Sequence, residues 1–316
     1  MSIFDDIRTR AKEVVEMADH VTISDRAVKN LSLKPLRRQD LSIDPARRFR
    51  GDAATTIDFV LMLDAVNFGS GWRDDLRREG SLAGDQRFYS SIMEALDRYV
   101  DQNGLPDART LQDISISHLS EIFGLAADKP AASTLLSLFQ KSLKDYASYI
   151  LDHHDGSGLR LIESCSGSAE KLVQSLSEIP SYRDQSVYKG LRVPFYKRAQ
   201  ISAADLHYAL ESEGPVFEDI DDLTAFADPA LPQILNAFGV LSYSAHLQSM
   251  IDSKTELAPG SQEEVEIRAA TIEAVEWIRK ANPSMRVMDI DFALWNMAGA
   301  KDLKNRPRHI TKTMSY

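Results

Sequence analysis

Apolar residues recur at steps of three and four along most of the chain, which is the spacing of one buried face on an α-helix. One such stripe, between residues 135 and 150, consists of Leu135, Leu138, Phe139, Leu143, Tyr146 and Ile150. Another lies at 172–179, where Ser168 suits a helix N-cap and Pro180 a helix stop. The same spacing predicts further helices over 3–18, 53–68, 88–100, 116–123, 196–210, 231–238, 242–251, 265–278 and 288–297.

The alternation that is typical of strands is scarce, and 187–193 is the one segment that we expect to form a short β-hairpin. Glycine accounts for 15 of 316 residues, below its usual share of about 7%, which fits a helical chain. No internal repeat, low-complexity run or long linker interrupts the pattern. The fold class predicted is therefore all-α: one mainly helical domain over 1–316, in one body or two lobes.

Charge and composition narrow the function. The chain has 37 Lys and Arg against 47 Asp and Glu, a formal net charge of -10, which disfavours a duplex nucleic-acid binder because such proteins need a basic surface. A single cysteine, Cys165, excludes an internal disulfide. No stretch approaches the roughly 18 apolar residues of a membrane span, and the first residues do not resemble a signal peptide. We expect a cytoplasmic protein without a membrane partner.

Several familiar motifs are absent or incomplete. The sequence has no P-loop pattern, and GSG at 69–71 lacks the third glycine of a dinucleotide-binding fingerprint. His153, His154 and Cys165 do not have the spacing of a standard zinc site. We therefore expect a polar loop at the two histidines and a buried, unreactive Cys165. No metal site is predicted.

Two cations follow aromatic residues in the segment 195–200, which reads FYKRAQ. Pro194 precedes it, and Lys197 and Arg198 fall at the expected start of a helix, where a phosphate can be received. Phe195 would border such a site. The alternative is an ordinary first helical turn whose cations are solvated or salt-bridged.

Carboxylates near the C-terminus offer a second set of candidates. Asp228 precedes Pro229, so it can cap a helix that starts there or face a substrate from the edge of an apolar pocket. Asp291 and Trp295 are four residues apart on one helix face, and Asn296 adjoins them. They could bind a flat heterocycle with a cationic arm, or form a buried Trp beside an Asp that bonds to backbone. The pair Glu264 and Arg268 indicates i,i+4 helix support.

Together these strings resemble the queuosine salvage protein family, whose members are queuosine 5′-phosphate N-glycosylases (hydrolases). The resemblance rests on SYRD at 181–184, FYKRAQ at 195–200, FAD with LPQ at 226–233, EVEIR at 264–268 and D-x-x-L-W at 291–295. It extends to Asn67-Phe68, to His309-Ile310 and to Tyr316, and covers nearly the whole chain. Two departures stand out: the family often has Asp where this chain has Asn296, and a base-contacting His of its N-terminal region has no assigned counterpart.

The resemblance implies a fold similar to the helix-hairpin-helix DNA glycosylases and hydrolysis of queuosine 5′-phosphate, with release of queuine. It implies that Asp228 is the catalytic carboxylate. Because the cleaved bond leaves positive charge on the sugar, a fixed carboxylate beside the anomeric carbon would stabilise it. It also implies a base-binding set, namely Phe226, Ala227, Asp291, Trp295 and Asn296.

Asp291 would be the counter-ion of queuine's amine, and Lys197 and Arg198 would hold the 5′-phosphate. We expect no metal or organic cofactor, a small-molecule substrate and a monomer. Three alternatives stay open: a glycosylase of another modified nucleoside or damaged base, a non-catalytic queuine-binding protein, and a helical scaffold without a pocket.

Overall fold

The computed structural model describes residues 1–31, 50–82, 87–214, 216–300, 303 and 306–316. The chain is mainly helical, as predicted, and it divides into two compact units. Unit 1 consists of Met1–Asp44, Asp184–Gln200 and Asp219–Lys312; unit 2 consists of Pro45–Arg183, Ile201–Glu218 and Thr313–Tyr316. Among the described residues, no helix is both long and apolar enough to cross a bilayer. That 1–316 forms a single domain stays a prediction.

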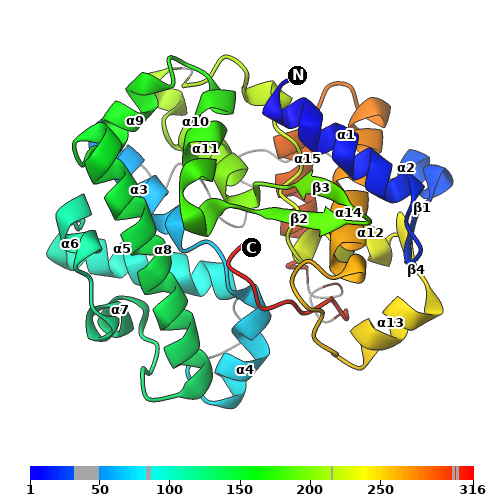
Figure 1. Cartoon of the computed structure of the whole chain (residues 1–316), viewed down its shortest axis with the longest axis horizontal. Coiled ribbons are helices and arrows are strands. Elements are labelled where there is room, and N and C mark those ends of the chain that lie inside the picture. Colours follow the sequence, from blue (N-terminus) through cyan, green and yellow to red (C-terminus); the bar gives the residue numbers. More distant parts are fainter. Residues whose placement is uncertain (32–49, 83–86, 215, 301–302, 304–305) are drawn as a thin grey trace. The chain divides into compact units, whose positions relative to one another are not determined.

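Unit 1 combines helices with two small sheets (Figure 1). In chain order its elements are α1 (Ile3–Glu16), β1 (Val21–Ile23), α2 (Asp25–Asn30), β2 (Gln185–Tyr188), β3 (Leu191–Pro194), the first turn of α11 (Lys197–Ala209), the 3-10 turn η6 (Ile220–Asp222), α12 (Ala230–Ala237), β4 (Leu241–Tyr243), α13 (Ala245–Asp252), α14 (Gln262–Ala281) and α15 (Val287–Met297).

The core of unit 1 is built around α14. Helices α1, α12 and α15 and the hairpin strand β2 all pack against it (Figure 1). Most of the 20 residues of α14 are buried, and these include Glu264, Glu266 and Arg268. Burying a charge is costly unless it is paired and hydrogen-bonded, so these three side chains must have partners inside unit 1.

The predicted hairpin at 187–193 is confirmed. Strands β2 and β3 pair antiparallel, with Tyr188 opposite Leu191. The two turn residues between them, Lys189 and Gly190, have φ of 46° and 86°, as a two-residue hairpin turn requires to match the strand twist. The sequence Lys-Gly thus closes the hairpin.

The second sheet was not predicted. Strand β4 pairs antiparallel with β1, Val21 lying opposite Tyr243. The prediction of a helix over 242–251 is therefore wrong at its start, because Ser244 is the N-cap whose side chain accepts from Leu247 N, and α13 begins after it. The three preceding residues find their hydrogen-bond partners on β1 instead.

Every regular element in the described part of unit 2 is a helix. Its elements are α3 (Ala53–Ala65), η3 (Ser70–Trp72), α4 (Arg73–Arg78), α5 (Phe88–Asn103), α6 (Ala108–Gln112), α7 (Ile116–Phe123), α8 (Pro130–His154), α9 (Gly158–Ser164), α10 (Ala169–Glu178), η4 (Pro180–Tyr182), the remainder of α11 and η5 (Glu211–Glu213).

The predicted helices of unit 2 form largely as expected. The apolar stripe of α8 is buried against α3, α6, α7 and α9. Ser168 caps α10 by accepting from Lys171 N, and Pro180 follows its end. Cys165 is buried, as predicted. The two histidines are a correction: His153 and His154 form the last turn of α8 rather than a loop, because the helix continues until Asp155 takes a left-handed conformation.

Candidate active site

Asp228 lies at the start of α12 in unit 1, and one of its carboxylate oxygens is committed there. Oδ1 accepts from Ala230 N at 2.8 Å and from Leu231 N at 3.2 Å. The helix begins at Ala230 rather than at Pro229, and Pro229 is its N-cap, so Asp228 satisfies the first N–H groups of α12 from one residue before the N-cap. The first N–H groups of a helix lack partners within it and favour a negative charge. Asp228 is half-buried, and no described residue hydrogen-bonds to Oδ2. One oxygen is thus anchored and the other is available.

The residues that lead to Asp228 are held at separate points along the backbone. Phe226 N donates to Asp291 Oδ2 at 2.7 Å. Two residues earlier, Thr224 N donates to Gln200 Oε1 at 2.9 Å, and Gln200 in turn donates to Phe195 O. The segment 224–228 is therefore fixed from α15 and from the first turn of α11.

Of the predicted base-binding residues on α15, Asp291 contacts this segment directly. Asp291 is only 3% exposed, and its bond to Phe226 N is the backbone contact that the sequence left as an alternative. The rings of Phe226 and Phe292 meet edge to face, with centroids 6.1 Å apart. Trp295 and Asn296 are half-buried one turn further along, where Asn296 Nδ2 donates to Phe292 O.

A buried ion pair joins two of the sequence motifs. Arg268 on α14 donates from Nη1 and Nη2 to the two oxygens of Asp184, each at 2.7 Å. Its Nε donates to Ala227 O at 3.3 Å, and its Cζ lies 3.9 Å from the centroid of the Phe195 ring. Both members of the pair are buried. Breaking such a pair by removing one partner costs about 3–5 kcal/mol.

Arg268 is the residue whose role the sequence analysis missed. The predicted i,i+4 contact exists, since Glu264 Oε1 is 3.7 Å from Arg268 Nε, but it is the lesser part of the environment of Arg268. A signal was present: Arg268 is three residues after Val265 and four before Ile272, so it falls on the apolar stripe of the helix. A charged residue at such a position needs a buried partner.

Lys197 and Arg198 open α11, and both are buried, at 4% and 2% exposed. Burial therefore excludes solvated cations, whereas the other alternative, salt-bridged cations in an ordinary first helical turn, stays open. Lys197 N also donates to Asp184 Oδ2 at 3.0 Å. The chain enters this helix through Tyr196, whose φ is 48°, a left-handed conformation that costs a non-glycine residue about 1–2 kcal/mol. Strain of this size persists only where the surroundings impose it.

His309, which entered the sequence analysis only through the resemblance, is buried in the same unit. Burial lowers its pKa to about 3, and the positive charges of Arg308 and Arg268 act in the same direction. Its imidazole is therefore neutral at physiological pH. The neighbouring Ile310 O accepts from Leu257 N at 2.8 Å, which fixes this part of the chain to the segment between α13 and α14.

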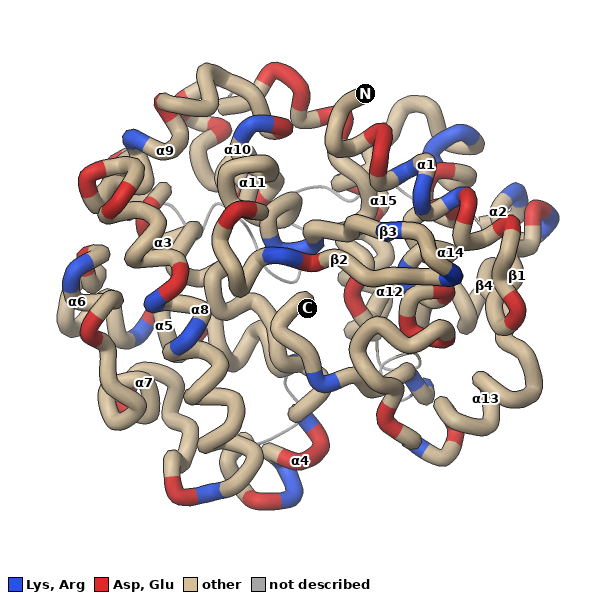
Figure 2. Tube along the Cα trace, viewed as in Figure 1, with Lys and Arg blue, Asp and Glu red and all other residues tan. Residues whose placement is uncertain are grey.

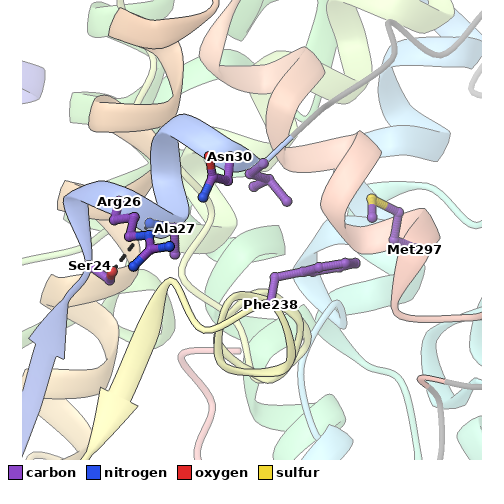
Figure 3. Close-up of a pocket in the computed structure, with 7 residues that line it drawn as sticks. Ser24, Arg26, Ala27, Asn30, Phe238 and Met297 are labelled. Carbon is purple, nitrogen blue, oxygen red and sulfur yellow. Dashed lines mark hydrogen bonds between the residues drawn. The ribbon is translucent and has the colours of Figure 1, made fainter.

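A separate hollow of about 440 Å³ also lies in unit 1. Figure 3 shows the Phe238 ring extending toward Met297, with Ser24, Arg26 and Asn30 of the α2 region opposite. None of the predicted site residues lines it. Phe238 follows the C-terminal end of α12 and Asp228 precedes its N-terminal end, so eight helical residues, about 12 Å, separate them.

Comparison with known proteins places the chain in a family. Residues 48–316 match the family model described as queuosine salvage protein. Three relatives carry the name queuosine 5′-phosphate N-glycosylase/hydrolase. The protein of Sphaerobacter thermophilus is 32% identical over 98% of this chain and 97% of its own length. The Mus musculus protein is 33% identical over 84% of each chain, and the Bos taurus protein 30% identical over 98% of each. The chain belongs to the queuosine salvage protein family.

Proposed function

We propose that this protein hydrolyses the N-glycosidic bond of queuosine 5′-phosphate. In this reaction the bond between C1′ and the base breaks, the oxygen of a water molecule bonds to C1′, and queuine and ribose 5-phosphate leave. Its relatives carry the name of this activity over nearly the full length of the chain. The observation that carries the proposal for this chain is Asp228, with one oxygen anchored at a helix start and the other unoccupied by described residues.

Asp228 is the proposed catalytic carboxylate. As the glycosidic bond lengthens, the sugar acquires positive charge, and a carboxylate that is already oriented stabilises it without reorganisation. Anchoring through Oδ1 fixes the plane of the group and directs Oδ2 to the reacting carbon. The same geometry serves an electrostatic role or a transient covalent bond to C1′.

The base is proposed to bind against α15 and the 226–227 segment. Trp295 supplies an indole surface for the flat deazapurine ring, and Phe226, Ala227 and Asn296 line the same region. Asp291 is the proposed counter-ion for the amine of queuine, alongside its bond to Phe226 N. A 7-deazapurine has carbon in place of N7, the atom at which guanine can be protonated as it leaves the sugar. Polar groups at the other edges of the base must therefore assist its departure.

The 5′-phosphate is proposed to bind at the start of α11. Lys197 and Arg198 provide two buried cations there, at a helix N-terminus, which favours negative charge. Phe195 closes one side of this region. A buried cationic pair at a helix start is better explained by an anionic ligand or a buried anion than by solvent exposure.

We also propose, from the family resemblance, that the chain acts as one monomeric domain with a fold similar to the helix-hairpin-helix DNA glycosylases, in the cytoplasm and without duplex nucleic acid as substrate. Figure 2 supports the last point, since acidic and basic positions are interspersed along the described trace; α4, for example, has Asp74 and Asp75 in its first turn and Arg77 and Arg78 in its last. The reaction as written consumes only water.

One experiment tests the proposal. The protein is incubated with queuosine, its 5′- and 3′-phosphates and guanosine 5′-phosphate, and base release is followed by chromatography. We expect queuine from the 5′-phosphate in preference to the other three. Binding of queuine without any release of ribose 5-phosphate would instead identify a carrier, and release from guanosine 5′-phosphate at an equal rate would identify a broader nucleotide hydrolase.

A further inference from the structure

We infer that Arg268, acting through Asp184, is a positioning residue that aligns Asp228 with the start of α11. This inference rests on the proposed function, in which Asp228 meets the sugar and the start of α11 meets the phosphate. Arg268 itself touches neither part of the substrate in this assignment. Its contribution is to hold these two parts of the site in a fixed position relative to each other.

The guanidinium group of Arg268 makes contacts through its two Nη atoms, through Nε and through the face of its plane. The fork makes two bonds of 2.7 Å with Asp184, Nε reaches Ala227 O at 3.3 Å, and the face covers the Phe195 ring at 3.9 Å. A planar group held in this way has one allowed orientation. It therefore transmits position between the residues that it touches.

At one end, the contact acts on the peptide that carries the catalytic carboxylate. Ala227 O belongs to the peptide group between Ala227 and Asp228, so a bond to it fixes the direction from which Asp228 leaves the backbone. The other constraints on Asp228 are its own cap on α12 and the bond from Phe226 N to Asp291. Without Arg268, the peptide between these two anchors can rotate.

At the other end, the contact acts on the proposed phosphate site. Asp184 Oδ2 accepts from Arg268 Nη2 and also from Lys197 N at 3.0 Å. Asp184 O accepts from Phe195 N at 2.9 Å. One carboxylate therefore sets the first residue of α11 and, through Arg268, the peptide before Asp228.

Stability alone does not account for this arrangement. Replacing a buried ion pair by packed apolar residues is often neutral or stabilising, so a fold that needed only stability would not require it. Glu266, two residues earlier on α14, provides the contrast. It is fully buried and accepts from Asp19 N, His20 N and Tyr188 Oη, and none of these hydrogen bonds reaches the 224–228 segment.

The test compares Arg268→Lys with Glu266→Gln as a control that is buried on the same helix. Lysine keeps the charge but has no fork and cannot bond to Asp184 and Ala227 O in the same way. We expect both variants to lower Tm. At a temperature where circular dichroism shows both fully folded, we expect Arg268→Lys to lower kcat for queuine release at least tenfold and Glu266→Gln to leave kcat within twofold of wild type.

The kcat of folded protein separates positioning from a structural role, because a merely structural residue changes Tm and not the turnover of folded molecules. Asp184→Asn serves as the second variant, with an expected fall in kcat of at least fivefold. Because the two residues act as a unit, their effects on kcat should not add. The kcat of the double variant Arg268→Lys/Asp184→Asn should therefore lie within twofold of that of the slower single variant. If Arg268→Lys does not fold, Asp184→Asn decides.

A kcat within twofold of wild type in the folded variant would overturn the inference while the proposed function stands. Fully additive losses in the double variant would overturn it as well. Wild-type protein that releases no base from queuosine 5′-phosphate would overturn the proposed function, and the inference would then fail with it.

Discussion

The backbone N–H of Phe226 donates to Oδ2 of Asp291 at 2.7 Å, so a carboxylate on α15 holds the segment that leads to Asp228. Asp291 therefore has two separable properties: an acceptor oxygen that positions the backbone and a negative charge that can meet the amine of queuine. Substitutions that remove one property without the other can measure each.

Asp291→Asn removes the charge and keeps an oxygen that can accept from Phe226 N, whereas Asp291→Ala removes both. We expect Asp291→Asn to weaken binding of queuosine 5′-phosphate about tenfold or more, as the loss of a charge-assisted hydrogen bond costs about 1.5–3 kcal/mol. An analogue without the cyclopentenediol amine should bind the Asn variant as it binds wild type. Asp291→Ala and Trp295→Ala should weaken both ligands. The measurement is KM and kcat for each pair; equal losses for both ligands in Asp291→Asn would show that the charge does not read the amine.

Asp228→Asn should keep the cap on α12 and abolish most of the activity. The side-chain oxygen of Asn can accept from Ala230 N and Leu231 N as Oδ1 of Asp228 does, so we expect Tm to change little, while base release falls about a hundredfold or more because the preorganised charge is lost. Asp107→Asn is the matched control, since Asp107 caps α6 by accepting from Thr110 N at 2.8 Å. Its rate should equal that of wild type. Turnover of Asp228→Asn within a few-fold of wild type would leave Asp228 as a cap alone.

Lys197→Ala should raise KM for queuosine 5′-phosphate. It should also reduce the ratio of kcat/KM for the 5′-phosphate to kcat/KM for the plain nucleoside. Loss of a charged donor to the phosphate corresponds to about ten- to a hundredfold in affinity. Lys189→Ala is the control; Lys189 at the hairpin tip pairs with Asp19 and Met17 O, away from the start of α11. The ratio of kcat/KM for the two substrates is the measurement. A ratio equal to that of wild type would remove Lys197 from the phosphate site.

His309 should make the protein less stable as the pH falls. Its folded-state pKa is about 3 against an ordinary value of 6.5, so the unfolded chain binds a proton that the folded chain excludes. Its contribution to stability is complete above pH 6.5 and is lost between about pH 6.5 and 3. Between pH 7.5 and 5.5 we expect the free energy of unfolding to fall by about 1.4 kcal/mol, the free energy that corresponds to one pKa unit.

Urea unfolding of wild type and of His309→Gln at these two pH values tests this. The variant lacks the titrating group, so its free energy of unfolding should change less than that of wild type by about 1.4 kcal/mol. The other histidines and the carboxylates are the same in both proteins, so their contributions cancel in the difference. The same change in both proteins would show that His309 is accessible to protons in the folded state.

Local sequence patterns determined most of the helices. The stripe within 135–150 became α8, and Ser168 and Pro180 bounded α10 where a cap and a stop belong. The hairpin was equally local, because Lys189 and Gly190 supply the turn that its strands need. These features depend on contacts between residues three or four apart, or across one turn, and such contacts are encoded by neighbours in the chain.

The pairing of β1 with β4 depended on tertiary structure. Each strand has only three residues, and the two strands are far apart in the sequence, since Val21 pairs with Tyr243. Three residues are too few to show an alternating pattern, so the spacing of apolar residues predicted a helix over all of 242–251. In the structure Ser244 caps α13, and the residues before it belong to β4. The candidate site also combines local and tertiary features. The sequence offered Asp228 as a helix cap or as a catalytic carboxylate, and its hydrogen bonds with Ala230 N and Leu231 N are contacts between neighbours in the chain.

The network around Arg268 was decided by tertiary structure alone. Its charge on an apolar stripe of α14 signalled that a buried partner must exist, because a charge without one is too costly to bury. Asp184 is 84 residues away in the sequence and lies in a different motif, so the helical pattern contained no information about which carboxylate that partner is. Periodicity reports which face of an element is buried, whereas the identity of the opposing group is set by the way distant segments pack together.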